Sequence, residues 1–407
     1  MERTELLYSV FFYLFLFNKE EGKMSDFIFR ITPNIVLGSY TINRLGQQIT
    51  EWGTRFMIIM DPILTEMKVQ DKVVEALNDR KIENFVFNEL TEGNTTKIAE
   101  RALILARESH VHGIIAVGGT KALSIGRLVA AFFNEIHDFY TFVDGSLPTT
   151  SPIPCICVPT TFREPFVFTN EVPVTDSRNN QLKIMRVQNN LCKLVLVDPN
   201  LMLTLTDNQK STIEIEVMNM ATEAYLSQKA NFFSDMFVEK GLQLLSYAMD
   251  GSPSLEITTP EEILLAQAGT MISLATASSS LGLSSLLSMT INSRYKLSKS
   301  LVSAILFPYA VEDAAQYKSA RIERLAKVMK IVPEDNELER DEIVRAFIDN
   351  TRQRLAKAKL PARLKDLQLS IEKLSLAVED VQQIDIVNKL PRSMTTDDIF
   401  DFVKAAY

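Results

Sequence analysis

The sequence predicts an N-terminal α/β domain built on a parallel sheet, followed by an all-α C-terminal domain. Three observations carry this prediction. The chain has 407 residues, which is more than one ordinary compact core needs. Apolar runs of strand length alternate with helical patterns as far as Pro199, as parallel strands and their crossover helices do. Beyond Pro199, helical patterns dominate to the C-terminus.

The first domain is expected over residues 24–199. Its strands are predicted from apolar runs at 56–61, 84–90, 113–119, 154–159 and 194–199. Apolar residues at helical spacing predict crossover helices at 67–80 and 96–110. A hairpin is predicted over 169–185, because the turn-forming run DSRNNQ occupies 176–181. This order of elements is Rossmann-like.

The second domain is expected over residues 200–407. Good helix starts occur in TDNQ at 206–209 and in TTPEE at 258–262, where a capping hydroxyl precedes a carboxylate or a proline. The predicted helices are 207–229, 232–250, 260–280, 299–316, 318–330, 337–358, 364–378 and 395–406. No long linker separates the domains, so we expect a ligand site in a cleft between them.

The first 23 residues are interpreted as a leader that is not part of the natural protein. Their apolar run LLYSVFFYLFLF, at 6–17, is shorter than the roughly 20 residues of a membrane helix, and no small-residue cleavage site follows it. KEEGKM, at 19–24, can be back-translated as a purine-rich run that resembles a ribosome-binding site before a start codon. Met24 is therefore the expected natural start.

The charge of the chain limits its partners. The net charge is -8 and the isoelectric point is about 5.2. No basic excess is present to displace the counterions of nucleic acid or to bind an anionic membrane. We therefore expect a small molecule, a nucleotide or another protein as partner, and neither nucleic acid nor a membrane.

The three cysteines lie in apolar runs and not in a spaced framework. Cys155 and Cys157 belong to PCICVP, and Cys192 to LCKLVLV. Buried thiols in a reducing cytoplasm are the main interpretation. A CxC redox or metal pair at Cys155 and Cys157 is the alternative.

Six motifs occur in an order that resembles one enzyme family. They are IIAVGGTKALSIGRLVAAF (114–132), VPTT (158–161), VDP (197–199), TEAYLS (222–227), LVSAILFPYAVE (301–312) and KLPRSMTTDDIFDFVKAAY (389–407). Together they look like the iron-containing alcohol dehydrogenases, a family that also holds the glycerol dehydrogenases and, more distantly, dehydroquinate synthase. The resemblance implies a nucleotide in the first domain, one divalent metal in the second, hydride transfer between an alcohol carbon and a nicotinamide, and a homodimer.

Of the four metal ligands of that family, only the carboxylate survives in this chain. The resemblance places the ligand carboxylate at Glu216, and the three ligand histidines at Met220, Ser285 and Lys299. A further histidine that the family often carries near the substrate falls on Met289. Divalent iron and zinc bind a thioether poorly, and an ammonium carries no lone pair. We therefore expect no metal at these positions.

The histidines of the chain give the same result without any comparison. Only His110, His112 and His137 occur, and all three lie in the first domain. A surface or capping role is expected for His110 and His112, which end a predicted helix. In the second domain, Lys299 supplies a cation that can replace the metal by pairing with Glu216. The alternative is that both side chains are solvated at the mouth of the cleft.

The phosphate loop that the resemblance implies is partly kept. Gly118 and Gly119 allow close approach of a phosphate to the backbone, and the helix that follows favours an anion. Thr120 and Lys121 replace a glycine and a serine of the family motif, and Lys121 is a candidate to bind phosphate directly. Asp61, at the end of FMIIMD, corresponds to the acidic residue that contacts the adenosine ribose. A purely structural turn and a strand-end carboxylate are the alternatives.

The segment PTTFREPFVFT, at 159–169, departs most from the family. Thr160 and Thr161 keep the cofactor-binding threonines. Where the family motif then has Ala, Gly, Gly, Ser and Glu, this chain has Phe162, Arg163, Pro165, Phe166 and Val167. We expect these side chains to fill part of the cofactor cleft, so that binding of NAD(P) is doubtful.

The favoured functional interpretation is a metal-free, catalytically silent homologue with a structural or regulatory role. The alternative is a metal-independent NAD(P)-dependent alcohol or aldehyde oxidoreductase. In that enzyme Lys299 supplies the electrophile beside Glu216, and Tyr309 or Ser285 supplies the proton. A third interpretation is a sensor of a small molecule or nucleotide without chemistry.

Overall fold

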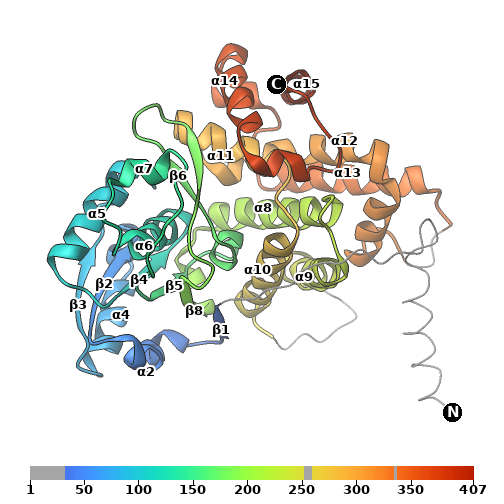
Figure 1. Ribbon diagram of the computed structural model, residues 1–407. Coiled ribbons are helices and arrows are strands. Elements are labelled where there is room, and N and C mark those ends of the chain that lie inside the picture. Colours follow the sequence, from blue (N-terminus) through green and yellow to red (C-terminus); the bar gives the residue numbers. More distant parts are fainter. Residues whose placement is uncertain (1–32, 252–258, 334–336) are drawn as a thin grey trace. The chain divides into compact units, whose positions relative to one another are not determined.

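The computed structural model describes residues 33–251, 259–333 and 337–407, and these residues belong to one compact unit (Figure 1). The leader predicted at 1–23 and the start predicted at Met24 lie outside the described residues. The unit contains a parallel sheet with helices on its faces, followed by a mostly helical part. The predicted fold class, an α/β domain plus an all-α domain, is therefore confirmed.

The sheet has six strands in the order β1-β8-β5-β4-β2-β3, and every neighbouring pair is parallel. Its strands are β1 (Asn34–Leu37), β2 (Arg55–Met60), β3 (Glu83–Phe87), β4 (Gly113–Gly118), β5 (Cys155–Pro159) and β8 (Cys192–Val197). The five predicted strands are present, because a strand that is covered on both faces is apolar along its whole length. The sequence prediction missed the edge strand β1.

Helices cover both faces of the sheet, and successive residues of β2 contact different sides. Met57 and Ile59 pack with the helices α5 (Thr96–Glu108) and α6 (Thr120–Phe132). Ile58 packs with α2 (Leu45–Ile49) and α4 (Val69–Asn78). The shorter helices near the sheet are η1 (Thr41–Arg44), η2 (Thr50–Trp52), α3 (Ile63–Glu66) and α7 (Phe139–Val143).

The order of the strands creates a switch point at the carboxyl ends of β2 and β4. The chain leaves β2 toward β3 on one side and returns to β4 on the other side. Open α/β sheets bind their ligands outside the carboxyl ends of the strands at such a point. Asp61 follows β2 there, and Gly118 ends β4.

The predicted hairpin is present as an antiparallel pair of strands, β6 (Glu171–Thr175) and β7 (Leu182–Arg186). The 3-10 helix η3 (Pro165–Phe168) precedes it and packs on helix α10 (Glu261–Ser278) of the second part. A second 3-10 helix, η4 (Pro199–Thr204), leads from the last strand into the helical part. Segment 159–169 thus runs along the junction between sheet and helices.

The helical part follows the predicted pattern with two corrections. Its elements are α8 (Asp207–Leu226), α9 (Phe232–Asp250), α10 (Glu261–Ser278), α11 (Leu283–Tyr295), α12 (Lys299–Val328), α13 (Arg340–Lys357), η5 (Leu364–Leu367), α14 (Ile371–Gln382), η6 (Asp385–Lys389) and α15 (Thr396–Ala406). The sequence prediction missed α11, and the single helix expected at 364–378 is divided into η5 and α14. Lys318 has non-helical backbone angles inside α12, where a break was predicted.

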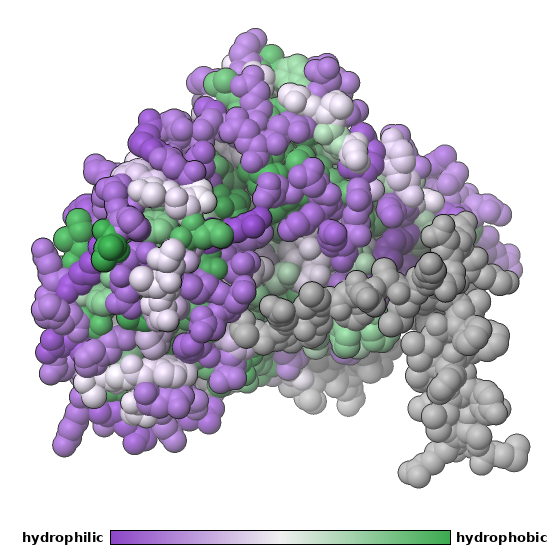
Figure 2. Space-filling model, viewed as in Figure 1, coloured by the Kyte–Doolittle hydropathy of each residue, from purple (hydrophilic) through white to green (hydrophobic). Residues whose placement is uncertain are grey.

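The visible face of the unit is mostly hydrophilic, with hydrophobic residues gathered near its middle (Figure 2). Within the described ranges no single helix is long and apolar enough to cross a membrane. Helices α10 and α11 reach that length and composition only as a pair that is bent by 96°.

Candidate functional site

Glu216 lies near the middle of α8, a helix that is buried on all sides from Thr212 onward. A capping box of Thr206 and Gln209 begins this helix, because each side chain accepts from the backbone N–H of the other residue. Glu216 itself is only 2% exposed. A carboxylate at this depth needs partners, because burying an unpaired charge costs several kcal/mol.

Two cations meet the carboxylate of Glu216. Lys299 Nζ lies 3.1 Å from Oε1, and Arg163 Nε lies 2.8 Å from Oε2. Ser300 adds a side-chain hydrogen bond. The contact between Lys299 and Glu216 is the one that the sequence predicts. Arg163, which reaches the carboxylate from segment 159–169, was not predicted.

The charges around Glu216 keep it ionised. Burial raises the pKa of this carboxyl, but the positive charges of Arg163 and Lys299 outweigh burial and hold the pKa below its usual range. The Nε–H of Arg163 is not aligned for a hydrogen bond to Oε2, so this contact is an ion pair. The arrangement is a buried anion neutralised by two internal cations.

The other former ligand positions are occupied by groups that have different tasks. Ser285 donates both its backbone N–H and its hydroxyl to the buried carboxylate of Glu223 at the start of α11. Met220 and Met289 are buried apolar side chains. Among the described residues, no group of three or more His, Cys, Asp or Glu side chains is placed to hold a metal. The donor set at this site does not fit divalent iron or zinc.

Tyr309 is not brought to the Glu216–Lys299 pair. Its hydroxyl donates to the backbone carbonyl of Ala362, at 3.3 Å, beyond the end of α13. Tyr309 also stands ten residues after Lys299 on the same helix, which corresponds to about 15 Å of helix length. The proton donors considered for a reductase, Tyr309 and Ser285, are thus hydrogen-bonded to other groups.

The loop that is predicted to bind phosphate lies at the switch point, and the backbone N–H of its second glycine is bonded within the chain. Gly118 has a φ of 143°, and a Cβ there would lie 2.3 Å from Oδ2 of Asp61. The backbone N–H of Gly119 donates to the same oxygen at 2.7 Å. Burial raises the pKa of Asp61, against the bond from Gly119 and the charge of Lys121. The predicted ribose ligand therefore contacts the predicted phosphate ligand.

A second carboxylate, that of Glu164, occupies the start of α6. Thr120 donates its hydroxyl to this carboxylate at 3.0 Å and 3.2 Å, and Thr161 donates at 2.7 Å. Glu164 is 4% exposed. Burial raises the pKa of its carboxyl, although Arg163 and Lys299 act in the opposite direction. Two predicted cofactor ligands, Thr120 and Thr161, are thus bound to a side chain of the protein itself.

The remaining predicted cofactor residues contribute less. Lys121 is exposed in the first turn of α6. Thr160 is buried, and its backbone N–H donates to the carbonyl of Gly118 at 3.0 Å.

His110 has a left-handed backbone after the end of α5, and Nδ1 of His112 accepts from the backbone N–H of Thr54, as expected for capping and surface roles.

Segment 159–169 fills the space between the phosphate loop and α10. A Cβ on Gly269 of α10 would lie 2.0 Å from the carbonyl oxygen of Phe162. Phe162 and Phe166 are buried. The cavity left beside Thr161 and Glu164 has a volume of about 10 Å³, whereas one water molecule needs about 10–15 Å³. This cavity has no room for a phosphate group.

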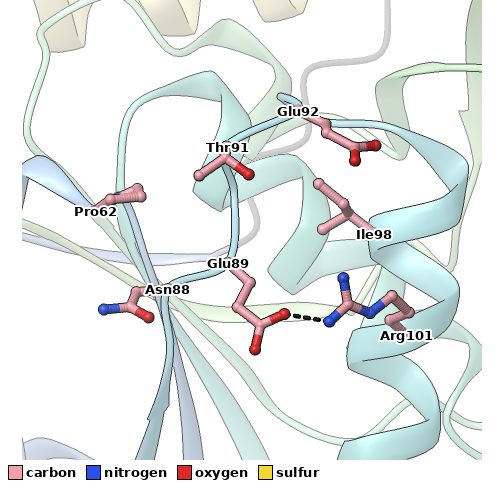
Figure 3. A pocket seen from close by; sticks show the side chains of 7 residues that line it. All are labelled: Pro62, Asn88, Glu89, Thr91, Glu92, Ile98 and Arg101. Carbon is pink, nitrogen blue, oxygen red and sulfur yellow. Dashed lines mark hydrogen bonds and ion pairs between the residues drawn. The ribbon is translucent and has the colours of Figure 1, made fainter.

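A larger pocket of about 360 Å³ lies at the end of β3, on the outer side of the switch point (Figure 3). Glu89 and Arg101 form an ion pair across it. Its other lining residues are Pro62, Asn88, Thr91, Glu92 and Ile98. None of the sequence-predicted site residues lines this pocket.

Sequence reasoning missed Arg163 and Glu164 as functional groups. The available signal was a pair of adjacent opposite charges between bulky apolar residues in TTFREPFVF. Charged residues in an apolar run are buried only when they are paired. Two of their partners, Glu216 on α8 and the hydroxyl of Thr120 on α6, lie far away in the sequence.

Comparisons with known proteins agree with this architecture. Residues 32–199 match the family model described as iron-containing alcohol dehydrogenase, and residues 212–407 match the C-terminal model of the Fe-containing alcohol dehydrogenase family. Lactaldehyde reductase of Escherichia coli K12 is 20% identical over 376 residues, which is 91% of this chain and 97% of that protein. NADH-dependent butanol dehydrogenase A of Clostridium acetobutylicum is 20% identical over 94% of this chain and 100% of its own length.

Solved structures share the fold at lower identity. A 1,3-propanediol oxidoreductase superimposes with a TM-score of 0.86 at 18% identity, covering 94% of this chain and 100% of that one. Sulfoacetaldehyde reductase from Bifidobacterium kashiwanohense, solved in complex with NAD+, gives 0.80 at 13% identity, covering 94% and 99%. The two family models together span most of the chain, and the chain therefore belongs to the iron-containing alcohol dehydrogenase family.

Proposed function

We propose that this chain is a metal-free member of its family that has lost hydride-transfer chemistry and keeps the fold for a structural or regulatory role. The observation that carries the proposal is the pairing of Glu216 with Lys299 and Arg163. In a metal enzyme of this kind the carboxylate is a ligand, and the metal polarises the oxygen of the substrate. Here the same carboxylate is neutralised by two side chains.

The chemistry of the pair supports this proposal. A divalent ion would have to approach Glu216 past two positive charges that already satisfy it. Lys299 offers no lone pair while it is protonated, and Met220 offers only a thioether. The loss of metal binding is therefore attributed to Arg163, Lys299 and Met220 together.

The alternative, a metal-independent oxidoreductase that uses Lys299 as electrophile, has less support. The ammonium of Lys299 is paired with Glu216, so its positive charge is already partly neutralised when a substrate binds. The hydroxyls of Ser285 and Tyr309 donate to Glu223 and Ala362. A substrate alkoxide would have to compete with these contacts.

Measurements of metal and of turnover test the proposal together. The full chain, purified from cells supplied with iron and zinc, is expected to carry a transition metal in far less than equimolar amount. It is also expected not to oxidise NADH or NADPH with short aldehydes, with or without added Fe²⁺ or Zn²⁺. Chelator-resistant turnover that disappears in Lys299→Met would establish the alternative.

A variant with restored ligands provides the matched control. Met220→His, Ser285→His and Lys299→His, combined with Arg163→Gly, return three imidazoles and remove both cations from Glu216. We expect this variant to bind Zn²⁺ and the unaltered chain not to bind it, as measured by elemental analysis after dialysis. Equimolar metal in the unaltered chain would contradict the proposal.

The proposal also includes the cellular compartment and the partner of the protein. The three cysteines are free and buried, which suits a reducing cytoplasm. A second copy of the chain, as the family resemblance implies, or another protein is the proposed partner. Sedimentation analysis of the purified chain measures whether a homodimer forms.

A further inference from the structure

The carboxylate of Glu164 lies where the phosphate loop of this fold would receive an anion. Gly119 is the N-cap of α6, whose N–H groups and dipole favour negative charge. A Cβ on Gly119 would lie 3.9 Å from Oε1 of Glu164, and 3.8 Å from both Oδ2 of Asp61 and Oγ1 of Thr161. Side-chain oxygens of the protein therefore surround the space beside Gly119 that the Cβ of any other residue would occupy.

Glu164 also makes contacts of the kind that a phosphate oxygen makes. Its two oxygens accept from the hydroxyls of Thr120 and Thr161, at 2.7 Å to 3.2 Å. From these contacts we propose that Glu164 is an internal ligand of the phosphate loop, which excludes dinucleotides and other phosphate-bearing ligands from it. The occupant of the loop is this side chain in place of a pyrophosphate.

Three contacts hold Glu164 in this position. The backbone N–H of Glu164 donates to Oγ of Ser273 on α10 at 3.1 Å. The preceding residue, Arg163, pairs with Glu216 on α8. Before it, the backbone of Phe162 packs against Gly269 so closely that no Cβ fits there. These contacts to two helices fix the backbone from which the carboxylate reaches the loop.

The inference goes beyond the proposed function and can fail separately from it. A chain without metal and without turnover could still bind a nucleotide, as a sensor would. Conversely, a metal bound to Glu216 would compete with Arg163 and Lys299, but not with Thr120 and Thr161, which donate to the carboxylate of Glu164. Binding of phosphate compounds tests the internal ligand, whereas metal content and turnover test the proposed function.

The experiment compares the full chain with Glu164→Ala and Glu164→Gln. The probes are ADP, inorganic phosphate and adenosine. Their binding is measured by isothermal titration calorimetry and by the shift of the thermal unfolding temperature. We expect Glu164→Ala to bind ADP at least about tenfold more tightly than the unaltered chain does, which is about 1.4 kcal/mol. We expect Glu164→Gln to show a smaller gain, because the amide keeps the bulk and loses the charge.

Glu135→Gln is the matched control. Glu135 is another buried carboxylate of the same domain, and it accepts from the backbone N–H groups of Thr149 and Thr150 at 2.6 Å and 2.7 Å. This variant loses a buried charge away from the phosphate loop and is expected to gain no ADP binding. A gain in either folded Glu164 variant, absent from Glu135→Gln, supports the proposal.

Three results would overturn the inference. The first is binding of ADP by the unaltered chain as tight as by Glu164→Ala. The second is no gain in either Glu164 variant when circular dichroism shows that at least one of them is folded. The third is equal binding of adenosine and ADP by Glu164→Ala, which would place the ligand away from the phosphate loop.

Discussion

Glu216 retains the carboxylate of a metal ligand in surroundings that make it an ion-pair partner. Its burial would be costly alone, but Lys299 at 3.1 Å and Arg163 at 2.8 Å supply opposite charges inside the protein. Loss of Glu216 would leave two cations without their anion, and loss of either cation would leave the buried carboxylate with one partner in place of two. The residues therefore depend on one another for stability.

Replacing one partner of this group tests that dependence. Lys299→Met removes the ammonium and leaves Glu216 with Arg163 alone, so we expect the free energy of unfolding to fall by about 3 kcal/mol, the lower end of the range for breaking a buried pair. Glu216→Met alone leaves Lys299 and Arg163 without their anion, and adding Lys299→Met to it should recover part of that loss because one of the two unpaired cations is removed. Urea denaturation of the two single variants and the double variant measures this coupling. No recovery in the double variant would contradict it.

Glu164 is expected to make stability depend on pH. Burial raises the pKa of its carboxyl in the folded chain, so the protonated form favours folding. This stabilisation is present below the unfolded pKa of about 4.3 and is lost as the pH rises through the raised folded value. Glu164→Gln stays neutral throughout. Its unfolding temperature, relative to the unaltered chain, should therefore increase from pH 4 to pH 8 in thermal scans, and a constant difference would contradict the assignment.

Among the elements, the segment from Pro159 to Thr169 distinguishes this chain most. It carries Arg163 to α8, places Glu164 at the start of α6 and packs Phe162 on α10. A loop that in relatives is expected to cover a cofactor thus connects three helices of its own chain. Buried polar contacts anchor this segment, and one of them can be tested in isolation.

Ser273→Ala removes the acceptor of the backbone N–H of Glu164. A buried donor without a partner costs about 1–3 kcal/mol, and we expect the free energy of unfolding to fall by that amount. Thr276→Val is the control on the same helix, because the hydroxyl of Thr276 donates only to the carbonyl of Ile272 one turn earlier. Chemical denaturation should show the smaller loss for the control. Equal losses would mean that the hydrogen bond from Glu164 to Ser273 contributes no more to the free energy of unfolding than the hydroxyl of Thr276 does.

The elements also show which features can be predicted from the sequence. Central strands such as β4 are apolar throughout and bounded by turns, so their pattern is unambiguous. Helix α11 was missed because it is buried nearly all round and rich in serine, and it lacks the polar face that defines helical spacing. The short edge strand β1 is too brief for any periodicity.

The candidate site was predictable only in part for a related reason. Glu216 and Lys299 lie on helices whose motifs fix their register, so their meeting followed from the helices. Arg163 and Glu164 lie in a loop, and their contacts depend on its path between domains. Spacing along the chain carries no information about such a path. Only the oddity of two charges among bulky apolar residues indicated that both are paired.

At the scale of the whole molecule, the sheet part and the helical part are joined by polar contacts of the chain itself. Arg163 reaches Glu216, and Thr175 of the hairpin donates to Ser293 of α11 at 3.0 Å. Gln181 of the hairpin turn donates to Asp380 of α14 at 2.9 Å. These contacts join the two parts directly. Such a molecule is expected to unfold as one unit.

Two variants of the ion-pair group around Glu216 distinguish unfolding as one unit from a general loss of stability. Arg163 joins the sheet part to α8, whereas Lys299 joins α12 to α8 within the helical part. Differential scanning calorimetry of the unaltered chain should give a single transition, with equal calorimetric and van't Hoff enthalpies if unfolding is reversible. Arg163→Met should broaden it or divide it into two, because it removes a contact between the parts. Lys299→Met should lower the transition temperature and leave one transition, because it weakens only the helical part. If both variants shift one undivided peak, the parts are joined mainly by apolar packing around Phe162 and Gly269, and Arg163 serves only to neutralise Glu216.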